Sequence, residues 1–309
     1  MRPFNSHTLA GHAAMLFANI IWGFMAPVSK YVMSFDSVSS FAVTGFRVAG
    51  ACVLFWIASI FLKNEKVERK DKIRLLFASM LAVMFNQGLF VTGVSMTSPV
   101  DASVITTFLP VITMVISAVI LSEPITFLKV GGIVLGISGA LILVLTAAAS
   151  NSGSNIWGDI CCICAQFSFA FYVVLFKDLV AKYSPITVMK WMFLFATLIF
   201  VPFLLPDMAA VDYSALPSSA YWGIVQVVVG GTFICYFLIP VGQHRLRPTV
   251  VVMYNYVQPL VATSAALAVG MDTFSPWKVL AAVLIFAGVF TVTQSRAKDD
   301  VVINNHKSE

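Results

Sequence analysis

Residues 213–244 read YSALPSSAYWGIVQVVVGGTFICYFLIPVGQH, a stretch without a single Asp, Glu, Lys or Arg. A helix needs about 20 mostly apolar residues to cross the roughly 30 Å hydrocarbon core of a bilayer, and this stretch exceeds that length. The whole 309-residue chain has the same character, because only 11% of its residues are charged and its mean hydropathy is +0.91. Soluble domains carry roughly 25% charged residues, so the composition excludes an ordinary soluble protein.

Further apolar stretches of comparable length occur throughout the chain. Two of them contain one internal cation each, Arg47 and Lys190. We therefore predict an all-α integral membrane protein with ten transmembrane helices. The expected helices cover residues 12–33, 38–62, 73–95, 100–121, 127–149, 156–176, 185–205, 218–240, 248–270 and 277–295.

The distribution of cations predicts the orientation. With both termini in the cytoplasm, 15 of the 19 Lys and Arg residues are cytoplasmic, and the four exceptions are Lys30 and Lys278 outside and Arg47 and Lys190 within helices. Such an excess is typical of the cytoplasmic side of a cell membrane. We expect a multi-pass protein of the inner or plasma membrane with cytoplasmic termini, in which residues 63–72 form a solvated loop. Topology explains the net charge of +5, so the expected surroundings are the lipid bilayer and no nucleic acid.

The two halves of the sequence repeat each other. At a constant offset of 149 residues the matching pairs are Gly93 with Gly242, Pro99 with Pro248, Pro110 with Pro259, Glu123 with Asp272, Lys129 with Lys278 and Gly139 with Gly288. At an offset of 147 they are Gly11 with Gly158, Ala18 with Ala165, Asn19 with Gln166, Phe24 with Phe171 and Lys30 with Lys177. We call residues related by either offset repeat mates. The pairs predict one five-helix repeat over residues 1–149, a second over 150–295, and a cytoplasmic tail over 296–309.

An odd number of helices in each repeat has a topological consequence. The second repeat must enter the membrane from the opposite side, so the repeat mates Lys30 and Lys177 are expected on opposite sides. Inverted repeats are typical of secondary transporters, because two equivalent halves can exchange conformations and open a central site to either side.

Two sets of short motifs occur in the chain, one in each half. The first-half motifs, between Asn86 and Gly139, are Gly93, Ser98-Pro99, Ala102-Ser103, Pro110, the turn Ser122-Glu123-Pro124-Ile125-Thr126, and Gly131, Gly132, Gly136 and Gly139. The second set runs from Gly242 through Pro248 and Pro259 to Gly288, where Asp272 and Thr273 replace a Glu-Pro dipeptide. These motifs resemble those of the EamA-type drug/metabolite transporter family. The resemblance implies an inner-membrane carrier of small metabolites, with a cavity lined by the first, third, fourth, sixth, eighth and ninth helices.

Two prolines mark candidate breaks in the membrane helices. Pro110 lies in a polar stripe of the fourth helix together with Ser103, Thr106, Thr113 and Ser117, which share one helical face. Its repeat mate is Pro259. Proline removes a backbone donor and can kink a helix, and breaks at matching places in two halves indicate a transport site. Small hydroxyls that permit close helix packing are an alternative explanation of the stripe.

Larger polar side chains surround these prolines. Each could line a cavity or form a hydrogen bond between helices, and the residues alone leave both readings open. The candidate lining residues are Asn19, Trp22, Asn86, Gln87, Thr106, Thr107, Gln166, Tyr236, Tyr254, Asn255 and Gln258.

Arg47 is a costly residue because it lies nine residues into the second helix, roughly 13 Å deep. It is a candidate anchor for a carboxylate or phosphate, or a structural residue that caps carbonyls or extends outward. The acidic residues all lie near the ends of helices, Asp101 and Asp159 among them, so we predict no strict proton coupling. Glu123 and Pro124 are expected to form a structural turn.

The remaining features predict neither a metal site nor a cofactor. The five cysteines are odd in number, and Cys161 and Cys164 lack further ligands nearby, so all five are expected to pack as small apolar residues. The smooth face formed by Gly131, Gly132, Gly136 and Gly139 is expected against the fourth or tenth helix, or against a second copy in a homodimer.

These features favour a secondary transporter over an enzyme, because no cluster of His, Asp, Glu or Cys lies near one face. The expected substrate is a small amphipathic metabolite, with an amino acid as the leading candidate, and it is exported or exchanged. The alternatives are a channel, a non-transporting multipass protein, or a carrier of nucleotide sugars or drug-like cations.

Overall fold

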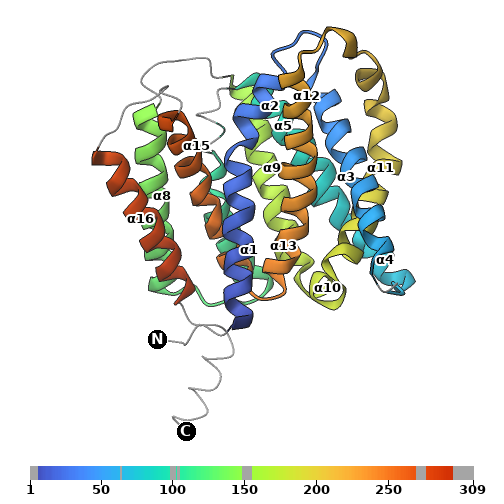
Figure 1. The fold of residues 1–309 in the computed structure, drawn as a ribbon. Coiled ribbons are helices and arrows are strands. Elements are labelled where there is room, and N and C mark those ends of the chain that lie inside the picture. The colour runs from blue at the N-terminus through green and yellow to red at the C-terminus, as the bar shows by residue number, and fades with distance from the viewer. Residues whose placement is uncertain are drawn as a thin grey trace.

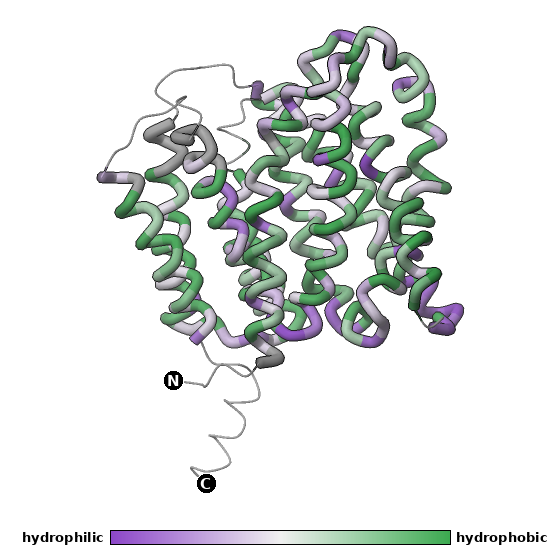
Figure 2. Tube along the Cα trace, viewed as in Figure 1, coloured by the Kyte–Doolittle hydropathy of each residue, from purple (hydrophilic) through white to green (hydrophobic). Residues whose placement is uncertain are grey.

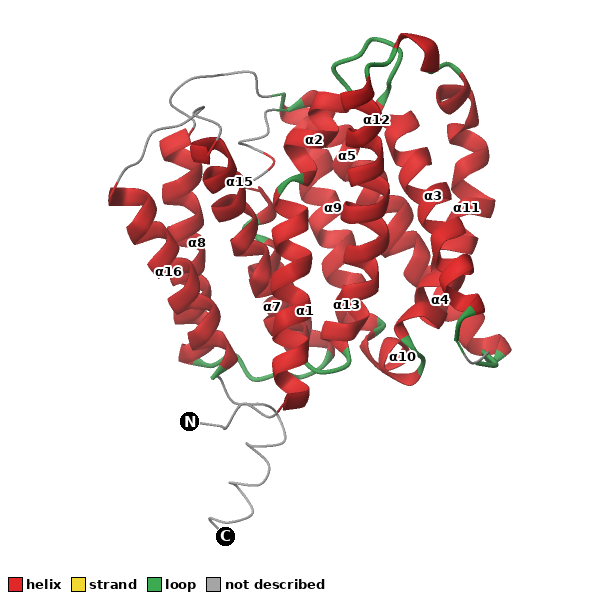
Figure 3. Cartoon of the chain, in the orientation of Figure 1, coloured by secondary structure: helices red, strands yellow, loops and turns green. Residues whose placement is uncertain are grey.

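The computed structural model describes residues 6–62, 65–97, 102, 105–147, 155–268 and 276–294. These residues form helices and connecting turns, without any strand in the described ranges (Figure 3). The helices lie side by side in one bundle, and the start of α1 and the end of α16 lie at the same end of it (Figure 1). The predicted all-α class is confirmed.

The helical regions of the first half are interrupted at three places in the described residues. These are a turn at Phe24, the π-helical segment η1, and a turn at Thr107 and Phe108. The elements are α1 (Ser6–Gly23), α2 (Met25–Val32), α3 (Ser40–Ile60), α4 (Arg69–Ser79), η1 (Met80–Phe85), α5 (Asn86–Met96), α7 (Leu109–Ile120) and α8 (Phe127–Ala147).

The second half is organised in the same way. It contains the π-helical segment η4 and the 3-10 turns η3 and η5. The elements are α9 (Ile156–Leu175), α10 (Lys177–Lys182), α11 (Pro185–Ala209), η3 (Tyr213–Ala215), α12 (Ser218–Val225), η4 (Gln226–Ile234), α13 (Cys235–Gln243), α14 (Pro248–Met253), η5 (Tyr254–Tyr256), α15 (Val257–Ala268) and α16 (Pro276–Thr293).

Several of these helices are long and apolar enough to cross a membrane. In the described ranges six segments meet both conditions, and three shorter apolar helices accompany them. The six are Thr8–Val32, Ser40–Ile60, Arg69–Met96, Ile156–Leu175, Pro185–Ala209 and Ser218–Gln243, and the shorter ones are Leu109–Ile120, Phe127–Ile142 and Val279–Thr293. Hydrophobic residues follow the helices and hydrophilic ones gather at the turns near α4 and α10 (Figure 2). Residues 248–268, expected as one helix, are divided by η5.

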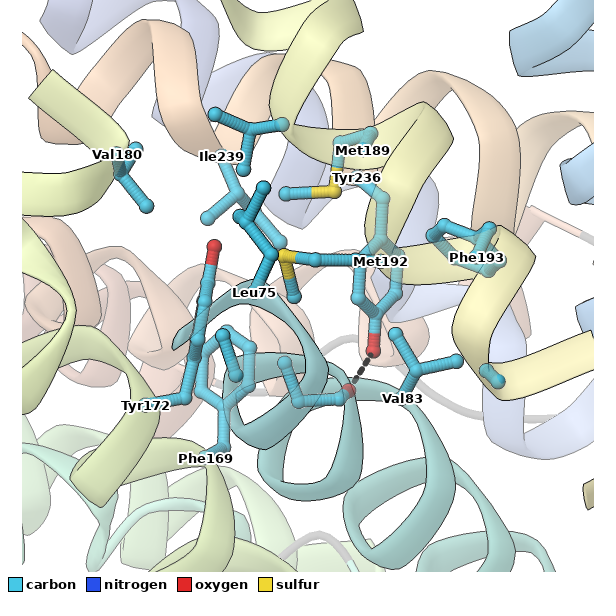
Figure 4. Packing of buried hydrophobic residues seen from close by; sticks show 14 of the residues in the cluster. Leu75, Val83, Phe169, Tyr172, Val180, Met189, Met192, Phe193, Tyr236 and Ile239 are labelled. Atoms are coloured by element: carbon cyan, nitrogen blue, oxygen red, sulfur yellow. Dashed lines mark hydrogen bonds between the residues drawn. The ribbon is translucent and has the colours of Figure 1, made fainter. Parts of the chain in front are cut away.

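Helices from the two halves pack against each other in pairs. The closest packed pairs are α8 with α16, α3 with α11, α5 with α9, and α1 with α13. Each pair joins one helix of the first half to one helix of the second. The largest apolar core contains side chains from α3, α4, α9, α11 and α13, including Leu75, Phe169, Met192 and Phe193 (Figure 4).

Glycines set the shortest approaches between paired helices. A Cβ added at Gly132 of α8 would lie 2.7 Å from the carbonyl oxygen of Gly288 in α16, and one at Gly139 would lie 2.6 Å from that of Ala281. The smooth face of the fifth predicted helix therefore packs against the tenth. Gly131 is the exception, because a Cβ added there meets nothing within 4 Å.

The turn between α3 and α4 is bonded to the chain around α10. Lys182 Nζ lies 2.6 Å from Asp71 Oδ2 and 2.7 Å from Glu68 Oε1, and the Tyr183 hydroxyl donates to Asp71 at 2.7 Å. These bonds raise the pKa of Lys182 above its ordinary range. Residues 63–72 were expected to form a solvated loop. In its described part Glu68 is exposed, Asp71 lies in the first turn of α4, and both side chains pair with the next turn on the same face.

Glu65 completes this connection. Its Oε2 accepts hydrogen bonds from the backbone nitrogen of Ser184 at 3.0 Å and from the Ser184 hydroxyl at 2.8 Å. Burial opposes ionisation, yet the hydrogen bonds from Thr187 and Ser184 lower the pKa of Glu65 overall. The Glu65 carboxylate therefore holds the start of α11 to the α3–α4 turn.

Candidate functional site

The π-helical segments η1 and η4 lie at matching places in the two halves. At the 149-residue offset, η1 corresponds to residues 229–234 of η4. A π turn leaves the usual helical hydrogen-bond pattern and is frequent at functional sites. Side chains from other helices bond to carbonyls of both segments: Trp22 Nε1 donates to Gly231 at 2.8 Å, and Tyr236 Oη donates to Ala82 at 2.7 Å (dashed line in Figure 4).

Four of the predicted lining residues come together around Tyr236. The Trp22 ring packs edge-on against the Tyr236 ring with centroids 6.1 Å apart, and Asn86 Oδ1 accepts from the Tyr236 hydroxyl at 3.4 Å. Gln87 lies beside the same hydroxyl. We define the Tyr236 cluster as Trp22, Arg47, Asn86, Gln87, Thr232 and Tyr236. It joins α1, α3, α5, η4 and α13.

Repeat mates meet in this part of the molecule. Gln87 and Tyr236 are mates at the offset of 149 and lie next to each other. Trp22 and Phe169 are mates at the offset of 147, and their rings pack edge-on at 6.0 Å. The Tyr236 cluster therefore lies where side chains from the two halves meet.

Arg47 points from α3 into the bundle. Its side chain is 4% exposed, and Nε donates to Thr232 Oγ1 at 3.0 Å. The Thr232 hydroxyl in turn donates to the carbonyl of Val227 at 2.8 Å. The sequence offered an outward-extending or carbonyl-capping side chain as the structural alternative. The structure instead gives Arg47 a hydroxyl partner in η4 and a position beside Tyr236.

Asn19 and Gln258 form a second polar contact between the halves. Gln258 Nε2 donates to Asn19 Oδ1 at 2.8 Å, and Asn19 Nδ2 donates to the carbonyl of Met15 at 2.8 Å. Nearer the start of α1, the Tyr254 hydroxyl and His12 Nδ1 lie 2.7 Å apart. These contacts join α1 to η5 and α15.

The remaining predicted lining residues are buried next to these contacts. Gln166 lies in α9 directly after Ala165, whose carbonyl accepts from Asn86 Nδ2 at 2.9 Å. Asn255 lies in η5, between the Tyr254 and Tyr256 side chains in sequence.

Thr106 and Thr107 lie at an interruption of the fourth predicted helix. The chain turns at Thr107 and Phe108, and α7 begins at Leu109 with Pro110 in its first turn. Pro110 therefore removes no hydrogen bond from a helix interior, and the predicted kink at this residue is a helix break just before it. Thr113 and Ser117 of the predicted stripe are fully buried, whereas Ser103 lies outside the described residues.

The equivalent interruption occurs in the second half. The 3-10 turn η5 ends directly before α15, and Pro259 is the third residue of that helix. Both prolines thus follow a break by two or three residues. A gating role for Pro110 and Pro259 stays a prediction.

The acidic residues of the described chain lie in turns or in the terminal turns of helices. Asp159 accepts from Thr97 Oγ1 at 2.6 Å in the first turn of α9. Glu123 follows Ser122, whose φ of 53° turns the chain out of α7, and it pairs with Lys129 Nζ at 2.8 Å. Asp101, Asp272 and Thr273 lie outside the described residues.

No metal centre is formed by the described residues, which contain no group of three or more His, Cys, Asp or Glu side chains placed to hold an ion. The five cysteines are free thiols. The candidate site offers buried polar side chains, hydrogen bonds between helices and aromatic rings, which suit non-covalent binding of a small molecule.

Sequence reasoning missed two parts of the site. Thr232, the partner of Arg47, lies four residues before Tyr236 and so shares its helical face, but nothing in the sequence singles it out from other buried threonines. The π segments also carry no strong sequence signal. Gly230 and Gly231 in η4 are a weak one.

Comparison with known proteins gives one consistent result. The EamA-like transporter family matches the chain twice, over residues 9–145 and 156–294. An uncharacterized transporter of Archaeoglobus fulgidus is 25% identical over 89% of this chain and 95% of its own length. The uncharacterized inner membrane transporter YicL of Salmonella typhimurium is 24% identical over 93% of this chain and 96% of its own length.

A more distant relative has a more specific name. A probable terminal-alkyne amino-acid exporter of Streptantibioticus cattleyicolor is 22% identical over 70% of this chain and 75% of its own length. Among solved proteins, one crystal structure has a TM-score of 0.72 at 17% identity and covers 93% of this chain and 96% of that chain. At this identity the structural match shows a shared fold alone.

Proposed function

The chain belongs to the EamA-like transporter family, and we propose that it is a secondary transporter that exports or exchanges a small amphipathic metabolite by alternating access. The family is one of membrane transporters and not of enzymes. Ten membrane helices in two inverted five-helix repeats, with both termini in the cytoplasm, complete the proposal.

The meeting of repeat mates around Tyr236 is the observation that supports this mechanism. Buried polar side chains from both halves are gathered there, next to helices that depart from α-geometry in both halves. Alternating access needs such an arrangement, because a site between two equivalent halves can face either side when the halves exchange conformations.

The order of the helices also supports an inverted repeat. The start of α1 and the end of α9 lie at the same end of the bundle, so these two repeat-related helices run in opposite directions (Figure 1). α5 packs against α9, and α13 packs against α1. Because α13 corresponds to α5 and α9 corresponds to α1 in the repeat, each contact becomes the other when the halves are exchanged, as an axis in the membrane plane requires.

The chemistry of the candidate site favours a small molecule with both polar and apolar parts. Amides at Asn86 and Gln87 lie beside the aromatic rings of Trp22 and Tyr236. An amino acid fits this combination, and the name of the Streptantibioticus cattleyicolor relative agrees with that class. We therefore propose amino acids as the leading substrate class.

Reconstitution tests the transport function directly. The purified protein is reconstituted in liposomes, and uptake of labelled amino acids, nucleotide sugars and hydrophobic cations is measured. Liposomes without the protein serve as the control. Counterflow that depends on unlabelled compound inside the vesicles supports a carrier. A flux that shows neither saturation nor counterflow would indicate a channel.

Substitutions test the proposed lining. Asn19→Ala, Asn255→Ala and Thr106→Val are expected to lower transport while protein levels hold, and unchanged transport in all three would exclude the lining. The topology has a separate test. A reporter that is active only in the cytoplasm should be active when it is fused after Glu309. Activity of a reporter that works only in the periplasm, fused at the same place, would overturn the orientation.

A further inference from the structure

Arg47 carries a buried donor that the protein leaves unused. Its Nε bonds to Thr232, but Nη1 is buried and has no hydrogen-bond partner. In the described part of the chain no Asp or Glu lies within ion-pair distance of it. Buried guanidinium groups are almost always paired, because an isolated charge in a low-dielectric interior is costly.

Gln87 is unsatisfied at the same place. Its amide nitrogen and amide oxygen are both buried and neither meets hydrogen-bond geometry with a partner, and the nearby Tyr236 hydroxyl is the group with which the side chain interacts. Gln87 and Arg47 both lie beside Tyr236, one from α5 and one from α3. Native proteins leave few buried polar atoms unpaired, and a group of three in one cluster points to a missing partner.

The unpaired atoms define what that partner must offer. A guanidinium nitrogen and an amide nitrogen are both donors, so the partner needs acceptor oxygens and a negative charge. The amide oxygen of Gln87 needs a donor in the same molecule. The rings of Trp22 and Tyr236, which pack edge-to-face, offer aromatic surface for an apolar or ammonium-bearing part of the partner.

We propose that Arg47 and Gln87 bind the carboxylate of the transported metabolite, and that the substrate is an α-amino acid held with its side chain or ammonium against Trp22 and Tyr236. This inference rests on the transport function proposed above. A carboxylate suits the cluster better than a phosphate, since a single guanidinium supplies one positive charge for a single negative charge. Thr232 holds the guanidinium in place through Nε, so Nη1 remains available for the ligand.

A structural role for Arg47 predicts a different result. If the side chain serves only to join α3 to η4, removing it costs stability and affects all substrates alike. If Arg47 serves the ligand, the protein without substrate carries an uncompensated buried charge. Removing the Arg47 side chain then leaves the stability of the substrate-free protein unchanged or raises it. The two roles therefore differ in the sign of the stability change.

The experiment compares four variants with the wild type. Arg47→Met keeps the length of the side chain without the charge, Arg47→Lys keeps the charge without the planar fork, and Gln87→Leu removes the amide. Arg69→Met is the matched control, because Arg69 is an exposed cation in the first turn of α4. Each variant is assayed for thermal unfolding without substrate and for uptake into liposomes.

The probes are the labelled L-amino acids together with the carboxamide and the decarboxylated amine of each. The wild type is expected to transport at least one acid and to discriminate against its carboxamide. Arg47→Met should lower uptake of that acid at low concentration roughly ten- to a hundredfold, which is the expected effect of losing a charge-assisted hydrogen bond. Arg47→Lys should retain part of the activity, and Arg69→Met should retain all of it.

Several outcomes would overturn the inference. Equal transport of acid and carboxamide by the wild type, or undiminished uptake by Arg47→Met, would exclude a carboxylate anchor. A lower unfolding temperature of empty Arg47→Met with full uptake per folded molecule would make Arg47 structural. Transport of neutral or cationic compounds alone would refute the inference and leave the proposed function intact, whereas an absence of any carrier flux would refute both.

Discussion

Substitution by alanine at two adjacent glycines of α8 is expected to change the stability of the protein in opposite directions. A Cβ added at Gly131 meets nothing within 4 Å, whereas a Cβ at Gly132 would lie 2.7 Å from the carbonyl oxygen of Gly288 in α16. Ordinary contact begins at 3.4 Å, so Gly132→Ala must separate the two helices by about 0.7 Å. The Cβ would also meet Cγ2 of Val292 at 2.6 Å, but the Gly288 oxygen belongs to the backbone, which cannot rotate away as a side chain can.

The magnitudes follow from this geometry. Inserting a methyl group into a packed contact costs typically about 1–3 kcal/mol, so Gly132→Ala should destabilise the protein by that amount. Gly131→Ala should stabilise it by about 0.5–1 kcal/mol, because alanine loses less conformational freedom than glycine in a helix. The two variants should therefore differ by about 1.5–4 kcal/mol although they have the same composition.

The assay is reversible unfolding of both variants in the same detergent, with the wild type alongside and size-exclusion chromatography to record the oligomeric state. Equal stability of Gly131→Ala and Gly132→Ala would refute the close packing of α8 on α16. If Gly131→Ala instead dissociated a dimer, the glycine face would be a contact between copies.

Tyr236→Phe is expected to lower stability by about 1 kcal/mol, because the carbonyl of Ala82 in a π segment loses its hydroxyl partner, and an unchanged unfolding midpoint would contradict this role. Acid should destabilise the folded protein in part through Glu65. The pKa of Glu65 in the folded protein lies below the unfolded value of about 4.3. Its contribution to stability is therefore present at neutral pH and is lost as the pH falls through the folded pKa. Unfolding temperatures of wild type and Glu65→Gln measured down to pH 3.5 check this, since the variant should lose less stability over the acid range. Finally, a pH gradient alone is expected to drive no sustained substrate uptake into liposomes, and concentrative uptake under such a gradient would show that protons are coupled.

Sequence patterns were sufficient for the all-helical class and for most of the long apolar helices. Spans of apolar residues located the helical regions within a few residues, because in a membrane every backbone polar group must be satisfied within its own helix. The constant offset of 149 residues pairs Gln87 with Tyr236, and the two side chains lie next to each other.

Side-chain partners were beyond the reach of the sequence. Nothing in the pattern around Arg47 identifies Thr232 as its partner, since the two residues lie on different helices and many buried hydroxyls could serve. The acidic residues of the α3–α4 turn look solvated in sequence, because their partner Lys182 is more than a hundred positions away. Pro110 indicated a kink, whereas the structure places it in the first turn of a new helix.

The pairing of α8 with α16 also constrains how the protein is made. Translation delivers α8 long before α16, so the glycine face of α8 emerges from the ribosome without the helix that will cover it. The same is true of α3, which waits for α11, and of α1, which waits for α13. These helices therefore remain without their main partners for different times, and α8 waits until synthesis is nearly complete. Premature chain termination before α16 should consequently leave the glycine face of α8 uncovered and open to quality-control proteases.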